Sequence, residues 1–244
     1  MNFKKDALRK PKDSTAAVLF IRHAHLVDED KKRADTKLSE KGIEDSKKFA
    51  VYYSTLSQLL SEEFNPYQTN YEIVYHGAED IRTYQTANLL FPSYKKVATS
   101  SLDRKFLPPL GVPEFMEKIK KIEELYPSPE QRRLRDAERI KFLLNEYEKP
   151  NHGVWGQPSN GKLFQPIEEC LMNFDRLIKE RKEGFRIFIG SEPVSLFYFA
   201  LIAKLPPEIR TPASGIGPNE SVIYYLKNSE SGIEIVDLQR IIPK

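Results

Sequence analysis

An arginine and two histidines follow the first apolar run of the chain. The run AAVLFI covers residues 16–21 and leads directly into Arg22, His23, Ala24 and His25. The planar guanidinium of an arginine suits bidentate binding of phosphate oxygens. A histidine beside a bound phosphate can act as a nucleophile and hold the phosphoryl group on nitrogen. This spacing indicates phosphate chemistry at the end of a strand.

Two further stretches carry groups that could reach the same phosphate. EDIRTYQTA places Arg82 in the first turn of a predicted helix. The stretch GSEP offers Ser191 or Glu192 as a helix N-cap, with Pro193 at the first helical position. Amide groups at such a helix start attract anions. Two arginines and one helix start could therefore converge on one anion.

Alternating strands and helices must position these groups. Because helices separate the early strands, right-handed crossovers and a mostly parallel central sheet are expected, with a C-terminal β-hairpin where NSESG joins the last two strands. Ligands of such α/β sheets bind beyond the carboxyl ends of the strands. The predicted strands are residues 16–21, 71–76, 185–190, 221–227 and 232–238.

Helices are predicted after three of these strands. In residues 38–60, apolar side chains recur at helical spacing and Ser39 is placed to cap the start. The second helix covers residues 78–91 and ends before Pro92, and the third is the apolar stretch 194–205.

One domain with one insertion is expected for a chain of 244 residues. From about Asp103 to Glu183 the sequence changes to charged helical runs broken by prolines, which we interpret as a helical insertion within a single domain over residues 1–244. The insertion contains a long loop whose Trp155 either closes over a ligand or pins the loop to the core.

Composition excludes several classes of partner. Lys plus Arg number 38 against 35 for Asp plus Glu, so the formal charge of +3 does not indicate nucleic-acid binding. No apolar run approaches the length of a membrane span, and the lone Cys170 cannot form an internal disulfide. A soluble, cytoplasmic protein is expected, whose oligomeric state the sequence leaves open.

The pieces LFIRHAH, TKLSEKGIEDSKKFA and EDIRTYQTA together resemble the histidine phosphatase superfamily, which includes the phosphoglycerate-mutase-like enzymes. The resemblance implies a three-layer αβα fold and hydrolysis of a phosphomonoester through a phosphohistidine, with no metal or organic cofactor. It implies that His23 is the nucleophile and that Arg22 and Arg82 bind the phosphate. Ala24 stands where the family usually has glycine.

This sequence departs from the family at a second histidine. The family pattern resembles Gly-His-x-Pro, whereas this chain has Ser191 in place of that histidine. A serine hydroxyl donates one hydrogen bond but lacks the charge of an imidazolium, and losing such a donor costs about a hundredfold to a thousandfold in rate. Ser191 is therefore a natural loss, a natural variant rescued by His25 or His76, or a deliberate substitution.

The proton donor has several candidates. One branch of the family takes it from the residue after the second histidine, which is Glu192 here, and burial would raise its pKa enough for general acid catalysis. Another branch takes it from the segment after the second arginine, where Asp103 and Glu114 are weaker candidates. His25 is a candidate substrate ligand.

Two functions follow from these residues. The first is a phosphomonoesterase acting through His23, impaired by Ser191. The second is an inactive pseudophosphatase that keeps the arginine pocket for a phosphorylated small molecule or a phosphoprotein. A metal-dependent hydrolase using the pair His23 and His25 is disfavoured, because no acidic residue is placed to complete a metal site.

Overall fold

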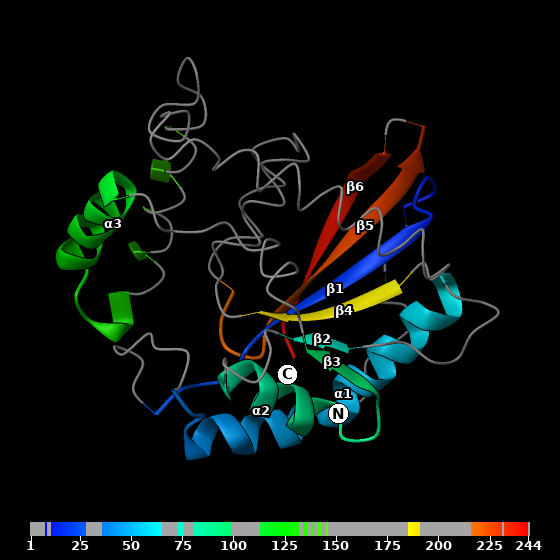
Figure 1. Ribbon diagram of the computed structural model, residues 1–244, viewed down its shortest axis with the longest axis horizontal. Coiled ribbons are helices and arrows are strands. Elements are labelled where there is room, and N and C mark those ends of the chain that lie inside the picture. Colours follow the sequence, from blue (N-terminus) through cyan, green and yellow to red (C-terminus); the bar gives the residue numbers. More distant parts are fainter. Residues whose placement is uncertain are drawn as a thin grey trace.

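The computed structural model describes residues 8, 11–27, 36–64, 73–75, 81–98, 113–131, 134, 135, 138, 141, 142, 145, 185–190, 216–230 and 232–243. Their elements in chain order are drawn in Figure 1. They are β1 (Ala16–Arg22), α1 (Glu40–Phe64), β2 (Ile73–Tyr75), α2 (Ile81–Leu90), β3 (Lys96–Ala98), α3 (Pro113–Leu125), the 3-10 helix η3 (Pro129–Gln131), β4 (Phe185–Gly190), β5 (Ser221–Ser229) and β6 (Gly232–Ile241).

The strands form one sheet in the order β3-β2-β4-β1-β5-β6. β1 pairs in parallel with β4, and β2 pairs in parallel with both β4 and β3. β5 pairs antiparallel with β1 and with β6, so the last two strands form the predicted hairpin. The α/β class is confirmed.

Three parallel strands end at one edge of the sheet. Arg22 at the end of β1 is in register with Gly190 at the end of β4, and Ile189 is in register with Tyr75 at the end of β2. A ligand site at the carboxyl edge of this sheet therefore draws on residues that follow β1, β2 and β4.

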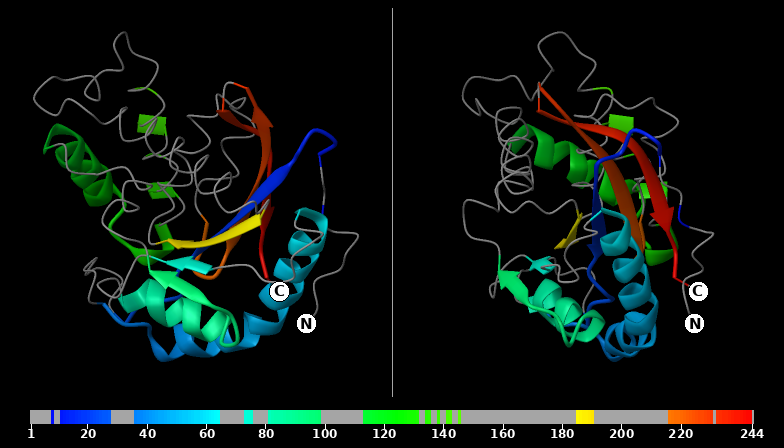
Figure 2. Two further views of the ribbon diagram at one scale, coloured as in Figure 1. Left: turned by 45° about the vertical axis from the view of Figure 1, so that its right-hand side comes forward. Right: turned by 90° about the vertical axis from the view of Figure 1, so that its right-hand side faces the viewer.

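Helices α1 and α2 cover the same face of the sheet. The crossover from β1 to β2 and the crossover from β2 to β3 step across the sheet in the same direction. Right-handed crossovers in one direction place both helices on one face. Figure 2 shows the two helices packed together below the strands, with α3 on the opposite side of the strands.

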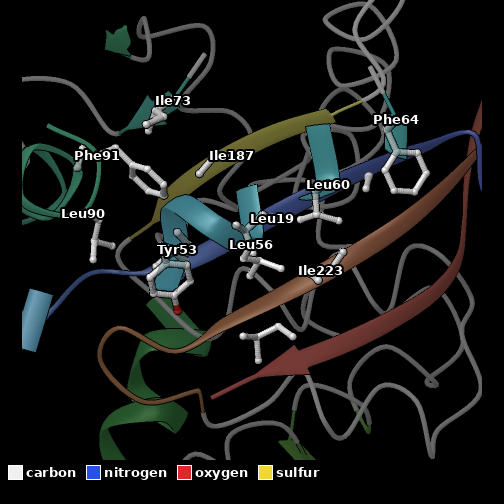
Figure 3. Close-up of a cluster of buried hydrophobic side chains, with 14 of the residues drawn as sticks. Leu19, Tyr53, Leu56, Leu60, Phe64, Ile73, Leu90, Phe91, Ile187 and Ile223 are labelled. Atoms are coloured by element: carbon white, nitrogen blue, oxygen red, sulfur yellow. The ribbon is translucent and has the colours of Figure 1, made fainter. Parts of the chain in front are cut away.

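The main core lies between this face and α1 (Figure 3). Alternate residues of β1, namely Ala17, Leu19 and Ile21, point into it because successive strand side chains face opposite sides. The remaining members come from both helices, from the residue after α2 and from four other strands: Tyr53, Leu56, Leu60, Phe64, Ile73, Ala87, Leu90, Phe91, Ile187, Ile223, Tyr225 and Ile241.

The predicted helices are confirmed with shifted ends. The first begins where expected and runs on to Phe64. The second is helical over Ile81–Leu90 and ends one residue before the predicted end at residue 91, while its predicted start at residues 78–80 lies outside the described residues. The strand β3 was not predicted, because KVA is three residues long and lacks any strand periodicity. The predicted helix 194–205 lies outside the described residues.

Within the part of the chain that the structure describes, no helix is both long and apolar enough to cross a membrane.

Candidate functional site

The chain leaves the sheet at the end of β1 with its polar residues buried. Arg22 is 6% exposed and His23 is 3% exposed, and Ala24 is fully buried. Charged and polar groups at this depth need partners, because desolvation without them is costly. The contacts of these three residues therefore define the candidate site.

Arg22 is fixed through both its main chain and its side chain. Its N–H donates to the carbonyl of Glu220 at 3.0 Å, and its own carbonyl accepts from the N–H of Asn219 at 3.2 Å. Its Nη1 donates to the carbonyl of Ile216 at 2.6 Å. The Nε of Arg22 is buried and has no hydrogen-bond partner among the described residues. Among the described residues, this cationic side chain is thus held in place with one N–H donor unused.

The turn that holds Arg22 is in turn fixed by α1. Asn219 in this turn has a φ of 60°, in the left-handed region that asparagine tolerates better than most residues. The Tyr53 hydroxyl donates to the Asn219 carbonyl, and Ser46 hydrogen-bonds the Asn219 side chain at 3.2 Å. Burial raises the pKa of Tyr53, so its phenol stays a neutral donor.

An ion pair closes the other side of the same turn. Glu220 accepts from Arg240 Nη2 of β6 at 2.5 Å, and from the N–H of Gly217 at 2.9 Å through the same oxygen. The carboxylate of Glu220 is therefore engaged by its own turn and by the neighbouring strand. The carboxylate of Glu220 thus pairs with Arg240 and not with Arg22.

His23 has its proton assigned by geometry. Nδ1 lies 2.7 Å from the carbonyl oxygen of Ala24. A carbonyl oxygen can only accept, so Nδ1 must carry the proton. In the neutral ring the lone pair then lies on Nε2, the nitrogen that a nucleophilic histidine requires.

Arg82 reaches this region from α2. It lies in the first turn of the helix and is 9% exposed. One turn later, the Thr86 hydroxyl accepts the N–H of Ala24 at 3.1 Å and donates to the carbonyl of Arg82 at 2.8 Å. The first turn of α2 is therefore bonded to the residue that follows His23.

His25 contacts the start of α1 through its main chain. Its carbonyl accepts from the N–H of Ser39 at 2.9 Å, while the Ser39 hydroxyl caps the helix by accepting the N–H of Gly42 at 3.1 Å. A Cβ on Gly42 would collide with the backbone of His25. The strand ends at Arg22, so His23 and His25 do not share a strand face.

The predicted site residues divide into two groups. Arg22, His23 and Arg82 are brought to one edge of the sheet, and His25 lies beside them. Ser191 and Glu192 lie outside the described residues, as do His76, His152 and Trp155, which the alternatives invoke.

Sequence reasoning missed several residues that build this edge. Thr86 could have been found, because it lies four residues after Arg82 on a predicted helix and so shares its face. Asn219 and Glu220 gave no local signal, since only the pairing of β1 with β5 brings them to Arg22. No group of three or more His, Cys, Asp or Glu within the described ranges could hold a metal ion.

The sequence matches no protein-family model and no curated protein. Solved structures share its fold. Mycobacterial hydrolase 1 is 13% identical, with 93% of this chain and 97% of that chain covered and a TM-score of 0.53. Phosphoserine phosphatase from Entamoeba histolytica, in complex with 3-phosphoglyceric acid, is 10% identical, with 93% and 98% covered and a TM-score of 0.51.

A mutant of the same Entamoeba histolytica enzyme in complex with phosphoserine is 12% identical, with 91% of this chain and 95% of that chain covered and a TM-score of 0.50. At identities this low, the structural similarity shows a common fold and nothing more. The likeness extends over nearly the whole of each chain, well beyond the pieces LFIRHAH and EDIRTYQTA.

Proposed function

Starting from the histidine phosphatase fold, which this chain shares with its structural neighbours, we propose that it is a phosphomonoesterase acting through a phosphohistidine at His23. One observation carries the proposal. His23 is buried at the carboxyl edge of the sheet with its proton held on Nδ1 by a carbonyl, which directs a lone pair on Nε2 out of the ring.

The proposed reaction consists of two displacements at phosphorus. Nε2 of His23 attacks phosphorus, the bond from phosphorus to the ester oxygen breaks, and the leaving oxygen takes a proton from Glu192. Water then attacks the phosphohistidine and gives its proton to the Glu192 carboxylate, and the bond from phosphorus to Nε2 breaks. Arg22 and Arg82 bind the phosphoryl oxygens throughout, and the Arg22 Nε supplies a buried donor for one of them.

Turnover is expected to be slow because Ser191 replaces the second histidine. Gly190 is in register with Arg22, so the chain continues into Ser191 from the edge of the sheet that carries His23. A hydroxyl at this position can donate a hydrogen bond to the phosphoryl group but brings no positive charge. His25 is the proposed additional contact to substrate.

We also propose a three-layer αβα architecture for the single domain, with the helical insertion 103–183 in the second helical layer. On β1 the face opposite α1 is buried too, at Val18 and Phe20. The parallel connection from β3 to β4 runs across the sheet in the reverse direction to the first two crossovers, and the right-handed rule assigns it to the opposite face. The position of α3 in Figure 2 supports this.

A pseudophosphatase is the second candidate, favoured by Ser191. Such a protein would keep the Arg22 and Arg82 pocket for a phosphorylated small molecule or a phosphoprotein in the cytoplasm. Two buried guanidinium groups bind an anion whether or not turnover follows.

Hydrolysis of an aryl phosphate separates the two candidates. The measurement compares the given chain with Ser191→His, with Ser191→His combined with His23→Ala, and with Ser191→Asn, which enlarges the side chain without supplying an imidazole. A gain of about a hundredfold or more in Ser191→His alone, abolished by His23→Ala, supports the phosphohistidine mechanism. Vanadate binding without turnover in any variant supports the pseudophosphatase, and absence of both rejects the site.

A further inference from the structure

We propose that Thr86 is a positioning residue, which holds His23 in the tautomer needed for nucleophilic attack through a chain of hydrogen bonds that also includes Arg82. The catalytic importance of this chain rests on the proposed function. Its existence and its effect on the imidazole ring do not.

The chain of hydrogen bonds begins at the Thr86 hydroxyl, whose proton and one of whose two lone pairs have assigned partners. Its single proton goes to the carbonyl of Arg82 at 2.8 Å. With that proton committed, its oxygen accepts the N–H of Ala24 at 3.1 Å. The direction of every bond is therefore set, because no second arrangement satisfies both partners of Thr86.

The chain continues through Ala24 to the imidazole. The N–H of Ala24 belongs to the peptide group that joins it to His23, so Thr86 fixes the peptide plane adjoining the His23 Cα. The carbonyl of Ala24 then accepts from Nδ1 at 2.7 Å. This carbonyl belongs to the following peptide group, so Thr86 acts on it through the backbone of Ala24, by holding the N–H side of the residue whose oxygen selects the ring tautomer.

Because these hydrogen bonds are buried, water cannot easily replace them. Thr86 and Ala24 are both fully buried. Hydrogen bonds in such surroundings polarise one another and are costly to leave unmade. A water molecule has no ready access to the place of the Thr86 oxygen, so losing that oxygen should release the peptide group between His23 and Ala24.

The chain also ties two elements together. The carbonyl of Arg82 belongs to the first turn of α2, whereas His23 follows β1. Thr86 bonds to both, so a shift of the helix start relative to the strand end must break one of its bonds. A proposed phosphate ligand and a proposed nucleophile are kept in fixed relation, and misplacement of about 1 Å can cost on the order of a hundredfold in rate.

Thr55 provides a matched control. Threonines in helices often donate to the carbonyl four residues back, and Thr55 does so to Val51 at 2.9 Å on the exposed side of α1. Thr86 makes the same bond and in addition accepts from a residue of another element. Only the second property is assigned a role, so Thr55→Val removes the common feature alone.

Nitrogen NMR of isotopically labelled histidine tests the proposal directly. The His23 signals, identified by their loss in His23→Ala, are followed through the pH range in which histidines titrate. In the unaltered chain we expect the neutral ring to carry its proton on Nδ1. In Thr86→Val we expect exchange between both tautomers and a changed titration midpoint, and Thr86→Ser and Thr55→Val should retain the original behaviour.

Three results would overturn the proposal. The first is a proton on Nε2 in the unaltered chain, which needs no variant at all. The second is a Thr86→Val protein that folds by circular dichroism and keeps the original His23 signals. The third is a failure of Thr86→Ser to restore them.

Turnover is measured separately in the Ser191→His background. There Thr86→Val should lower kcat by on the order of tenfold to a hundredfold, and Thr86→Ser should recover most of it. If Thr86→Val changes the His23 tautomer but no protein shows turnover, the positioning role of Thr86 is supported and the phosphatase function is rejected. If kcat and the His23 NMR signals are both unchanged in Thr86→Val, the phosphatase function is supported and the positioning role of Thr86 is rejected.

Discussion

The middle and the end of β1 differ in how they are held. The middle contributes Ala17, Leu19 and Ile21 to an apolar core packed against α1. One residue later the chain buries Arg22 and His23, whose environment is built from directional bonds to carbonyls. Apolar burial tolerates small shifts and adds stability over area, whereas each polar contact depends on one donor and one acceptor.

This difference separates stability from function along a single strand. Core side chains in the middle stabilise the fold without reaching the edge where a ligand would bind. Buried charges at the end cost desolvation energy, and their partners offset only part of it. Substitutions in the middle should therefore lower stability at unchanged ligand affinity. Substitutions at the end should lower ligand affinity with a smaller change in stability.

The largest effect is expected in the core that packs on the middle of β1, to which α1 contributes Leu60. Leu60 is fully buried in the main core, so Leu60→Ala should lower the free energy of unfolding by about 2 to 5 kcal/mol through lost transfer energy and the cavity left behind. Urea unfolding measures this, and vanadate affinity of the folded fraction should not change. Leu125→Ala, at a leucine that is 70% exposed on α3, is the matched control.

A smaller effect, on ligand affinity and not on stability, is expected at the site beside the end of β1, to which α2 contributes Arg82. Arg82→Met should lower vanadate affinity by about tenfold to a hundredfold, since a hydrogen bond to a charged group contributes about 1.5 to 3 kcal/mol. The melting temperature should change less than in Leu60→Ala, because the desolvation cost of a buried guanidinium is removed together with its contacts. Lys47→Met, on the exposed side of α1, controls for the change in net charge, and a large loss of stability in Arg82→Met would contradict the comparison.

Alkaline pH probes the contact between the two regions. Burial raises the pKa of Tyr53 and of Tyr224 above the ordinary value of 10.0. Above pH 10.0 the unfolded chain loses these protons while the folded chain keeps them, so stability is present below that pH and falls as pH rises beyond it. The expected slope is about 1.4 kcal/mol per pH unit for each such tyrosine.

Tyr53→Phe should reduce the slope of stability against pH above pH 10.0, because phenylalanine has no hydroxyl proton to lose in the unfolded chain. At neutral pH the same variant loses the hydrogen bond to the Asn219 carbonyl, which costs about 1 kcal/mol. Urea unfolding at several pH values gives both quantities. Identical alkaline slopes in the two proteins would show that Tyr53 does not contribute to them.

The smallest effect is expected on α3. The hydrogen bond from Lys121 lowers the pKa of Glu117, but both side chains are largely exposed, at 67% and 66%. Lys121→Ala should leave the melting temperature unchanged and let the Glu117 carboxyl titrate at a higher pH, which carboxyl NMR detects. A clear drop in melting temperature would mean that exposed pairs on α3 matter as much as buried contacts do.

Local pattern predicted most of the described elements. Four of the five predicted strands coincide with observed strands to within a few residues. In the fifth, residues 73–75 are described and form β2. Ser39 caps α1 as its position before an amphipathic run suggests. β3 had no such pattern, because an edge strand of three residues is defined by its neighbour β2.

By itself the sequence determined the alternation of strands and helices and the chemistry available at the end of β1, because hydrophobic period and side-chain type are local properties. Only the tertiary structure decided which groups hold Arg22 and His23. Ile216 and Asn219 come from nearly two hundred residues away in the chain, through the pairing of β1 with β5. Thr86 meets Ala24 because the start of α2 lies beside the residues that follow β1. Such contacts depend on how elements pack, which no single stretch of sequence encodes.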